Sequence, residues 1–179
     1  GDLLSGICRG QTISTLALVE ASATYEARGV QLEARRDKED YVLEGSKLFV
    51  SDAQVADVMI VAARTSHHDD PNRGITLLMV PTSAQGISIT PHFTVAADKQ
   101  ASIELSGVRV PSTSILGKED EGWPVLQRAL QRAAVAKCVE MVGGAEAVLK
   151  MTVEYVKQRV QFGLPVGSFQ AVQYYCADI

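Results

Sequence analysis

An arginine that precedes a rigid loop is the first residue of this sequence whose surroundings suit a defined chemistry. Arg159 closes a long helical pattern, and the segment Val160–Gly167 (VQFGLPVG) follows it directly. A guanidinium group carries a planar fork of donors that can bind two phosphate oxygens at once. An arginine in the last turn of a helix can also simply complement the helix dipole. Taken alone, the residues leave both roles open.

Metal and thiol chemistry have weaker support. The run His67–Asp70 (HHDD) could in principle ligate a metal, but turn-forming residues flank it, so a solvated loop is favoured. The three cysteines, Cys8, Cys138 and Cys176, are far apart and lack CxxC spacing. We therefore expect free, mostly buried thiols in a reducing compartment, and no metal site.

Composition and missing fingerprints exclude several classes of protein. The chain has 17 basic and 21 acidic residues, a net charge of −4, and no basic stripe, which argues against nucleic acid as a partner. Its longest apolar run, Val58–Ala63, is far too short to span a membrane. Gly1–Ser5 shows no basic leader, so no export signal is expected. No P-loop, GxGxxG or GxSxG pattern is present.

Strand patterns occupy the first two thirds of the chain. Short β-branched or alternating segments bounded by turn residues occur at 12–19, 30–34, 41–43, 46–51, 58–63, 74–80, 87–90, 102–105 and 108–110. Glu44-Gly45 is interpreted as a turn between two of them. No helical pattern interrupts the strands, which argues against a parallel βαβ sheet. An antiparallel barrel or sandwich of about a hundred residues is predicted.

Helical periodicity replaces the strand pattern after the charged linker 118–122. One helix is predicted from Gly122 to Arg159, with apolar residues at spacings of three and four from Val135 to Val156, and a second helix opens at 168–171. The apolar face of this helix predicts that other helices pack against it. Gly143-Gly144 either lets a neighbouring helix or ligand approach closely or is a tolerated packing glycine pair. The predicted fold class is α+β, with the strands first and the helices after them.

Ten short segments, in their order along the chain, are together similar to those of one enzyme family. They are Leu16–Glu20 (LALVE), Tyr41–Ala53 (YVLEGSKLFVSDA), Ala56–Asp57, Val108–Pro111, Leu116–Gly117, Glu121–Trp123, Val142–Ala145, Tyr155, Arg159–Gly163 (RVQFG) and Phe169–Ala171 (FQA). In this order and spacing the chain resembles the acyl-CoA dehydrogenase family over essentially its whole length.

The resemblance implies a domain organisation and an activity. Residues 1–10 resemble the tail of an N-terminal helical domain, residues 11–118 a middle β-barrel domain, and residues 119–179 the truncated start of a C-terminal helical-bundle domain. The family uses FAD to oxidise acyl-CoA thioesters between the α and β carbons and passes the electrons to an electron-transfer flavoprotein. Its members are dimers or tetramers of the bacterial cytoplasm or the mitochondrial matrix. The same is expected here.

The resemblance also carries over cofactor-binding residues. Leu16, Leu18 and Val19 match the strand that contacts the flavin edge, Phe49 an aromatic residue packed on the flavin, and Ser51 a hydroxyl residue near its N5 atom. By composition alone a strand phenylalanine such as Phe49 is more often a core residue. Arg159 matches an arginine that binds the FAD pyrophosphate in the neighbouring subunit's site. Three further residues match positions that touch the same cofactor: Gln161, Phe162 and, on its adenosine half, Gln170.

Several positions depart from the family pattern. Ala21–Glu26 replaces a glycine-rich loop, and Tyr25 stands where relatives have a serine that helps to hold CoA or flavin; Tyr25 is therefore the substrate-binding candidate. Ala133-Ala134 replaces a Glu-Arg pair that carries the catalytic base in some relatives. No other glutamate matches a base position, so no catalytic residue is nominated. Two alternatives stay open: a non-catalytic flavin- or acyl-CoA-binding subunit of the same fold, and an oxidase that uses oxygen directly.

Overall fold

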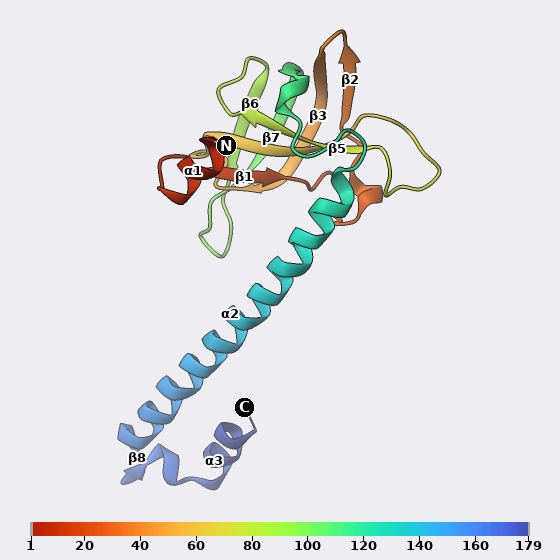
Figure 1. Ribbon diagram of the computed structural model, residues 1–179. Helices are drawn as coiled ribbons and strands as arrows, with labels where there is room; N and C mark the ends of the chain where they lie inside the picture. Colours follow the sequence, from red (N-terminus) through yellow and green to blue (C-terminus); the bar gives the residue numbers. More distant parts are fainter. Residues whose placement is uncertain (1, 179) are drawn as a thin grey trace. The chain divides into compact units, whose positions relative to one another are not determined.

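The computed structural model describes residues 2–178, which form two compact units divided after Gln127. The first unit holds a short helix, α1 (Asp2–Cys8), a β-sheet and the first turns of a long helix, α2 (Gly122–Gln158). The second unit holds the rest of α2, a small hairpin and a final helix, α3 (Gln170–Ala177) (Figure 1). The strands precede the long helix, which confirms the predicted α+β class.

Seven strands form one mixed, open sheet. They are β1 (Ser14–Ala17), β2 (Glu33–Asp37), β3 (Asp40–Ser51), β4 (Val58–Arg64), β5 (Ile75–Pro81), β6 (Ile87–His92) and β7 (Gln100–Pro111). The order is β1-β4-β2-β3-β7-β6, with β5 paired to β4 as well. Short 3-10 helices, η1 (Ala27–Gly29) and η2 (Ser112–Ser114), lie in two of the connections.

The predicted β-sheet middle domain is present, and its sheet differs from a closed antiparallel barrel in two details. Both β1 and β2 run parallel to β4, and the sheet does not close, because β1 and β6 stand at opposite ends of its order. Parallel pairing needs a long crossover connection. Here the β2–β3 hairpin lies between β1 and β4 in the chain, so strands rather than a helix supply that connection.

Two β-bulges interrupt the long antiparallel ladder between β3 and β7. The first puts one extra residue, Gly107, on β7 opposite the step from Leu43 to Glu44, and Gly107 has a φ of +66°. The second puts one extra residue on β3, at Leu48–Phe49. Since the extra residues lie on opposite strands, the pairing has the same alignment at both ends of the ladder.

The predicted turn at Glu44-Gly45 is wrong. β3 continues through it, and Gly45 pairs with Leu105 of β7. A Cβ at Gly45 would lie 3.2 Å from the Cγ of Leu32, so the glycine allows a close approach of the Leu32 side chain and does not form a turn. Turn-type residues inside a strand commonly mark such approaches.

The core of the first unit lies between the inward-facing residues of the sheet. It contains Ala17, Leu32, Ala34, Tyr41, Leu43, Val50, Met59, Val61, Leu78, Val80, Ile103, Leu105, Val108 and Val110. The first turn of α2 packs on this unit, since Trp123 and Leu126 are buried. Gly122 fits against β5 so closely that a Cβ there would lie 2.9 Å from the Ile75 carbonyl oxygen.

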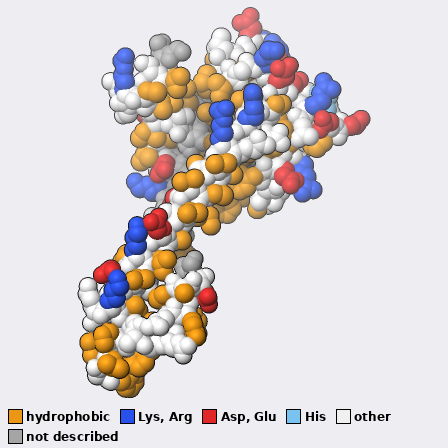
Figure 2. Space-filling model, turned by 60° about the horizontal axis from the view of Figure 1, so that its bottom comes forward, with side chains coloured by type: hydrophobic (Ala, Val, Ile, Leu, Met, Phe, Trp, Pro, Cys, Tyr) orange, Lys and Arg blue, Asp and Glu red, His pale blue; other side chains and the backbone are white. Residues whose placement is uncertain are grey.

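The second unit consists of α2 from Arg128 onward, the hairpin β8 (Val160–Gln161) and β9 (Leu164–Pro165), the 3-10 turn η3 (Val166–Ser168) and α3. The apolar residues Val135, Val139 and Val142 of α2 are exposed in this chain, and Figure 2 shows apolar side chains spread along the helix. On α2, Glu146 and Lys150 form an exposed ion pair at 2.7 Å.

Two remaining expectations concern thiols and membranes. Cys8 and Cys138 are exposed and Cys176 is half-buried, so the expectation of mostly buried thiols is wrong for the described residues. All three are free. Within residues 2–178, no helix is both long enough and apolar enough to cross a lipid bilayer.

Candidate functional site

An edge strand provides the first part of the candidate site in the first unit. β1 pairs only with β4, so its other edge carries backbone groups that no strand uses. The following residues, Leu18 and Val19, have buried side chains, so their backbone groups are the ones considered for a ligand. Their backbone amides find no acceptor within residues 2–178. Leu16 is half-buried. The segment can therefore donate hydrogen bonds from its backbone.

The bulge in β3 provides the second part. Phe49 has a φ of +54° and is 53% exposed, so it is not the core residue that composition alone would favour. Its ring lies 6.2 Å, centroid to centroid, from the ring of His92 on β6. Ser51 is also exposed. Non-glycine residues with a positive φ are held there by their surroundings, and they are frequent at binding sites.

Hydrogen bonds tie the two parts together. The Leu48 amide donates to the Val19 carbonyl at 2.8 Å, and the Thr15 hydroxyl donates to the Ser51 carbonyl at 2.6 Å. These bonds lie on either side of Phe49. The segment that follows β1 therefore lies beside the part of β3 that carries Phe49, and the cofactor-binding roles of Leu16, Leu18, Val19, Phe49 and Ser51 stay predictions.

A buried ion pair next to this place was missed by the sequence interpretation. The Lys47 ammonium group donates to the Glu20 carboxylate at 2.7 Å and to the Leu18 carbonyl at 3.2 Å. Strand alternation from Tyr41 and Leu43 puts Lys47 on the inward face, and a buried lysine needs an acidic partner. That alternation was the available signal.

Tyr25 lies in the loop that departs from the family pattern. Its side chain is largely exposed, and no hydrogen bond from its hydroxyl occurs within the described part of the chain. The loop is organised locally, since the Thr24 hydroxyl accepts a hydrogen bond from the Glu26 amide at 3.2 Å. Tyr25 is therefore accessible to a ligand, and its substrate-binding role stays a prediction.

A tight hairpin presents the candidate residues of the second unit. Arg159 follows the last residue of α2, and its backbone carbonyl accepts the Val166 amide at 2.7 Å, which closes the hairpin. The turn residues Phe162 and Gly163 have φ values of +52° and +81°. Positive φ at both central residues is the requirement of a type I′ turn, which suits a two-residue hairpin. The rigid loop predicted after Arg159 is confirmed.

The side chains of this hairpin are free to bind a ligand. Arg159 is exposed, and within residues 2–178 no carboxylate forms an ion pair with it. Phe162 is 95% exposed and meets Phe169 edge to face at 6.3 Å. Gln161 donates only to the neighbouring Val160 carbonyl, and Gln170 donates to the Tyr174 hydroxyl. The assigned roles of these residues stay predictions.

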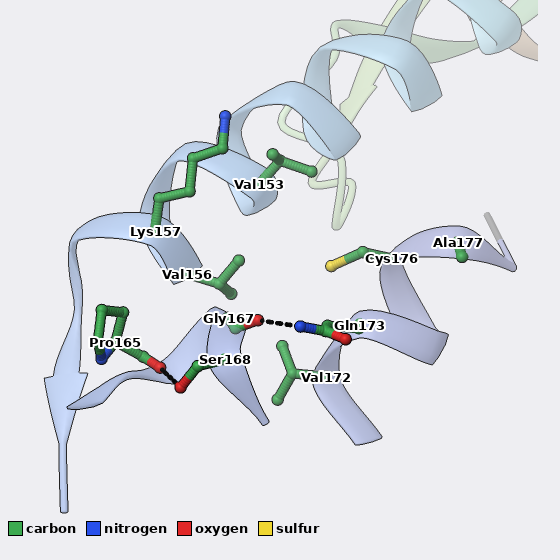
Figure 3. Close-up of a pocket in the computed structure, with 10 residues that line it drawn as sticks. All are labelled: Val153, Val156, Lys157, Pro165, Gly167, Ser168, Val172, Gln173, Cys176 and Ala177. Carbon is green, nitrogen blue, oxygen red and sulfur yellow. Dashed lines mark hydrogen bonds between the residues drawn. The ribbon is translucent and has the colours of Figure 1, made fainter. Parts of the chain in front are cut away.

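An apolar pocket of about 590 Å³ lies beside the hairpin but contains none of these candidates. Val153 and Val156 of α2 line one side, and Val172, Cys176 and Ala177 of α3 line the other (Figure 3). The Gln173 amide donates to the Gly167 carbonyl at 3.0 Å and holds α3 in place. The other polar side chains of its lining also have local partners, since the Ser168 hydroxyl donates to the Pro165 carbonyl and Lys157 forms an ion pair with Glu154.

Comparison with known proteins agrees with this geometry. Residues 15–110 match the family description "acyl-CoA dehydrogenase, middle domain", and residues 120–179 match "acyl-CoA dehydrogenase, C-terminal domain". The chain belongs to the acyl-CoA dehydrogenase family.

Three relatives illustrate the similarity. The probable acyl-CoA dehydrogenase YngJ of Bacillus subtilis is 33% identical over 98% of this chain and 47% of its own length. The structure of butyryl-CoA dehydrogenase from Megasphaera elsdenii superposes with a TM-score of 0.91 at 30% identity, over 99% of this chain and 47% of that one. The structure of a glutaryl-CoA dehydrogenase from Mycobacterium smegmatis in complex with FADH2 superposes with a TM-score of 0.87 at 27% identity. This match covers 99% of this chain and 45% of that one. The chain spans about half the length of these relatives.

Proposed function

We propose that this chain is the central part of an FAD-dependent acyl-CoA dehydrogenase. The observation that carries the proposal is the exposed Phe49 ring beside the free edge of β1, in a chain of this family. We assign residues 1–10 to the end of an N-terminal helical domain, 11–118 to the middle domain and 119–179 to the start of the C-terminal domain.

The residues of the first unit suit the flavin ring of FAD. The amides of Leu18 and Val19 would donate to the polar edge of the ring system, and Leu16 would line that edge. Phe49 would pack on the ring face, and the Ser51 hydroxyl would donate near N5. Hydrogen bonds from Lys47 and Leu48 of β3 hold the carbonyls of Leu18 and Val19. The segment that carries the amide donors is therefore held before the cofactor binds, which favours charge stabilisation on reduction.

The residues of the second unit suit the phosphate half of the cofactor. Arg159 would bind the pyrophosphate bound to a neighbouring subunit, with Gln161, Phe162 and Gln170 as further contacts. Because the hairpin is closed by the Val166 amide, the guanidinium starts from a rigid base. A dimer or tetramer follows from this assignment, since Arg159 then completes the cofactor site of a neighbouring subunit.

When bound, FAD supplies the chemistry of accepting a hydride from the β-carbon of the thioester while a base removes the α-proton. We assign Tyr25 to substrate binding. No residue of this chain is assigned as the base, because Ala133-Ala134 stands at the one base position that the chain contains. The electrons would pass to an electron-transfer flavoprotein. The same two alanines favour the second candidate, a non-catalytic flavin-binding subunit.

The visible absorption spectrum of the complete protein tests the proposal. We expect flavin bands in the purified protein or after addition of FAD, and bleaching of those bands when acyl-CoA thioesters of graded length are added without oxygen. Reoxidation by an electron-transfer flavoprotein then identifies the acceptor. A protein that stays colourless with FAD would refute FAD binding. Flavin bands that no thioester bleaches would support the non-catalytic subunit, and rapid reoxidation by oxygen alone would support an oxidase.

A further inference from the structure

The buried pair Glu20–Lys47 is charged and lies outside every role assigned above. Lys47 is 0% and Glu20 9% exposed. Besides the ammonium group, the carboxylate accepts the amides of Gln31 and Leu32 at 3.0 Å each. Burial lowers the pKa of Lys47, and the Glu20 carboxylate opposes that shift. Every polar atom of the pair therefore has a partner.

Stability alone does not account for such a pair. Replacing a buried ion pair by apolar residues of similar volume is often neutral or stabilising, because both charges must leave water. Removing one partner is strongly destabilising, since the other charge stays buried and unpaired. The pair must therefore be considered for what it holds in place.

The pair holds the two parts of the flavin-binding place together. Lys47 binds the Leu18 carbonyl, and the next residue along β3 binds the Val19 carbonyl. Both bonds fix the segment that leaves β1, whose free amides face no other acceptor. They also fix β3 immediately before Phe49, whose positive φ requires a firm support.

We infer that Glu20 and Lys47 are positioning residues for the cofactor, holding the amide-bearing edge of β1 at a fixed distance from the Phe49 bulge. This inference rests on the proposed FAD binding. Neither residue touches the cofactor in this account. Their loss should loosen the site without removing any group that contacts the cofactor, so the cofactor would bind more weakly and less uniformly.

A double variant separates positioning from stability. Glu20→Gln with Lys47→Met removes both charges, keeps the volume and keeps an acceptor for the Gln31 and Leu32 amides. In the complete protein we expect an apo unfolding midpoint within about 3 °C of the wild type, an FAD dissociation constant raised at least tenfold, and weaker visible circular dichroism of the bound flavin. Lys47→Met alone should lower the midpoint clearly, because it leaves Glu20 buried without its cation.

The matched control is Glu146→Gln with Lys150→Met, which neutralises an exposed pair of the same spacing between charged atoms, 2.7 Å. It should change neither the midpoint nor FAD binding. A Glu20/Lys47 double variant that binds FAD as tightly as the wild type overturns the inference. A double variant that does not fold overturns it too, since the pair would then serve the fold. If the wild type binds no FAD, the proposed function itself fails.

Discussion

Phe49 offers a test in which backbone strain and ligand binding can be separated. Its φ of +54° costs any residue other than glycine about 1–2 kcal/mol of folding free energy. Phe49→Ala keeps that cost and loses the ring, whereas Phe49→Gly loses the ring but relieves the cost. Glycine also loses more backbone entropy on folding, and this loss offsets roughly 0.5–1 kcal/mol of that gain. We therefore expect the glycine variant to be the more stable by about 0.5–1 kcal/mol.

Both variants lose the same aromatic contact with the cofactor. An aromatic contact contributes about 0.5–1.5 kcal/mol beyond its buried area, so FAD should bind up to about tenfold more weakly to each. Urea unfolding of the apo proteins gives the stability order, and quenching of FAD fluorescence gives the affinities. If Phe49→Gly is less stable than Phe49→Ala, the bulge does not hold position 49 in the left-handed region, and the reasoning about the site is refuted.

Three further predictions concern charge, ionisation and packing. Arg159→Ala should lower FAD occupancy but barely change the apo unfolding midpoint. The control Lys157→Ala, which removes a charge two residues away, should change neither quantity. Equal FAD occupancy in both variants would leave Arg159 only a dipole-pairing role. Burial and a hydrogen bond to a carboxylate raise the pKa of Tyr41 to about 12. About 2 kcal/mol of folding stability should therefore be lost between about pH 10 and 12, because the unfolded chain gives up this proton at a lower pH than the folded protein does. Tyr41→Phe should abolish that loss when unfolding is measured as a function of pH. Gly122→Ala should destabilise the protein by about 1–3 kcal/mol in the same unfolding assay. The control Gly143→Ala, whose added Cβ has no atom within 4 Å in this chain, should be neutral or stabilising. Equal effects of the two variants would contradict the close packing of Gly122 on β5.

Local patterns predicted the elements well but not their partners. The alternating segments became strands, and the periodic segment became a helix ending at Gln158, one residue before the predicted end. The pairing of β1 with β4 joins residues more than forty positions apart in parallel. Such a choice depends on which faces can be buried together, and no window of sequence contains that information.

The candidate site was predictable where it depends on motif and not where it depends on a bulge. Phe49 occupies a strand, where alternation and composition favour the core, yet one extra residue rotates it outward. The same shift explains why Lys47 and Val50, three positions apart, are both buried. For Phe49, only the family resemblance indicated a ligand. For the buried ion pair, the strand pattern did contain a signal, because it places Lys47 on the inward face.

The paired bulges of β3 and β7 constrain how this sequence can change. Each shifts the ladder by one residue in the opposite sense, so the irregular stretch is confined between Gly107 and Phe49. Deleting either extra residue alone would carry the mismatch to one end of the ladder and turn its inward residues outward. Descendants of this gene should therefore gain or lose the two extra positions only as a pair, which links the glycine bulge of β7 to the orientation of the Phe49 ring on β3.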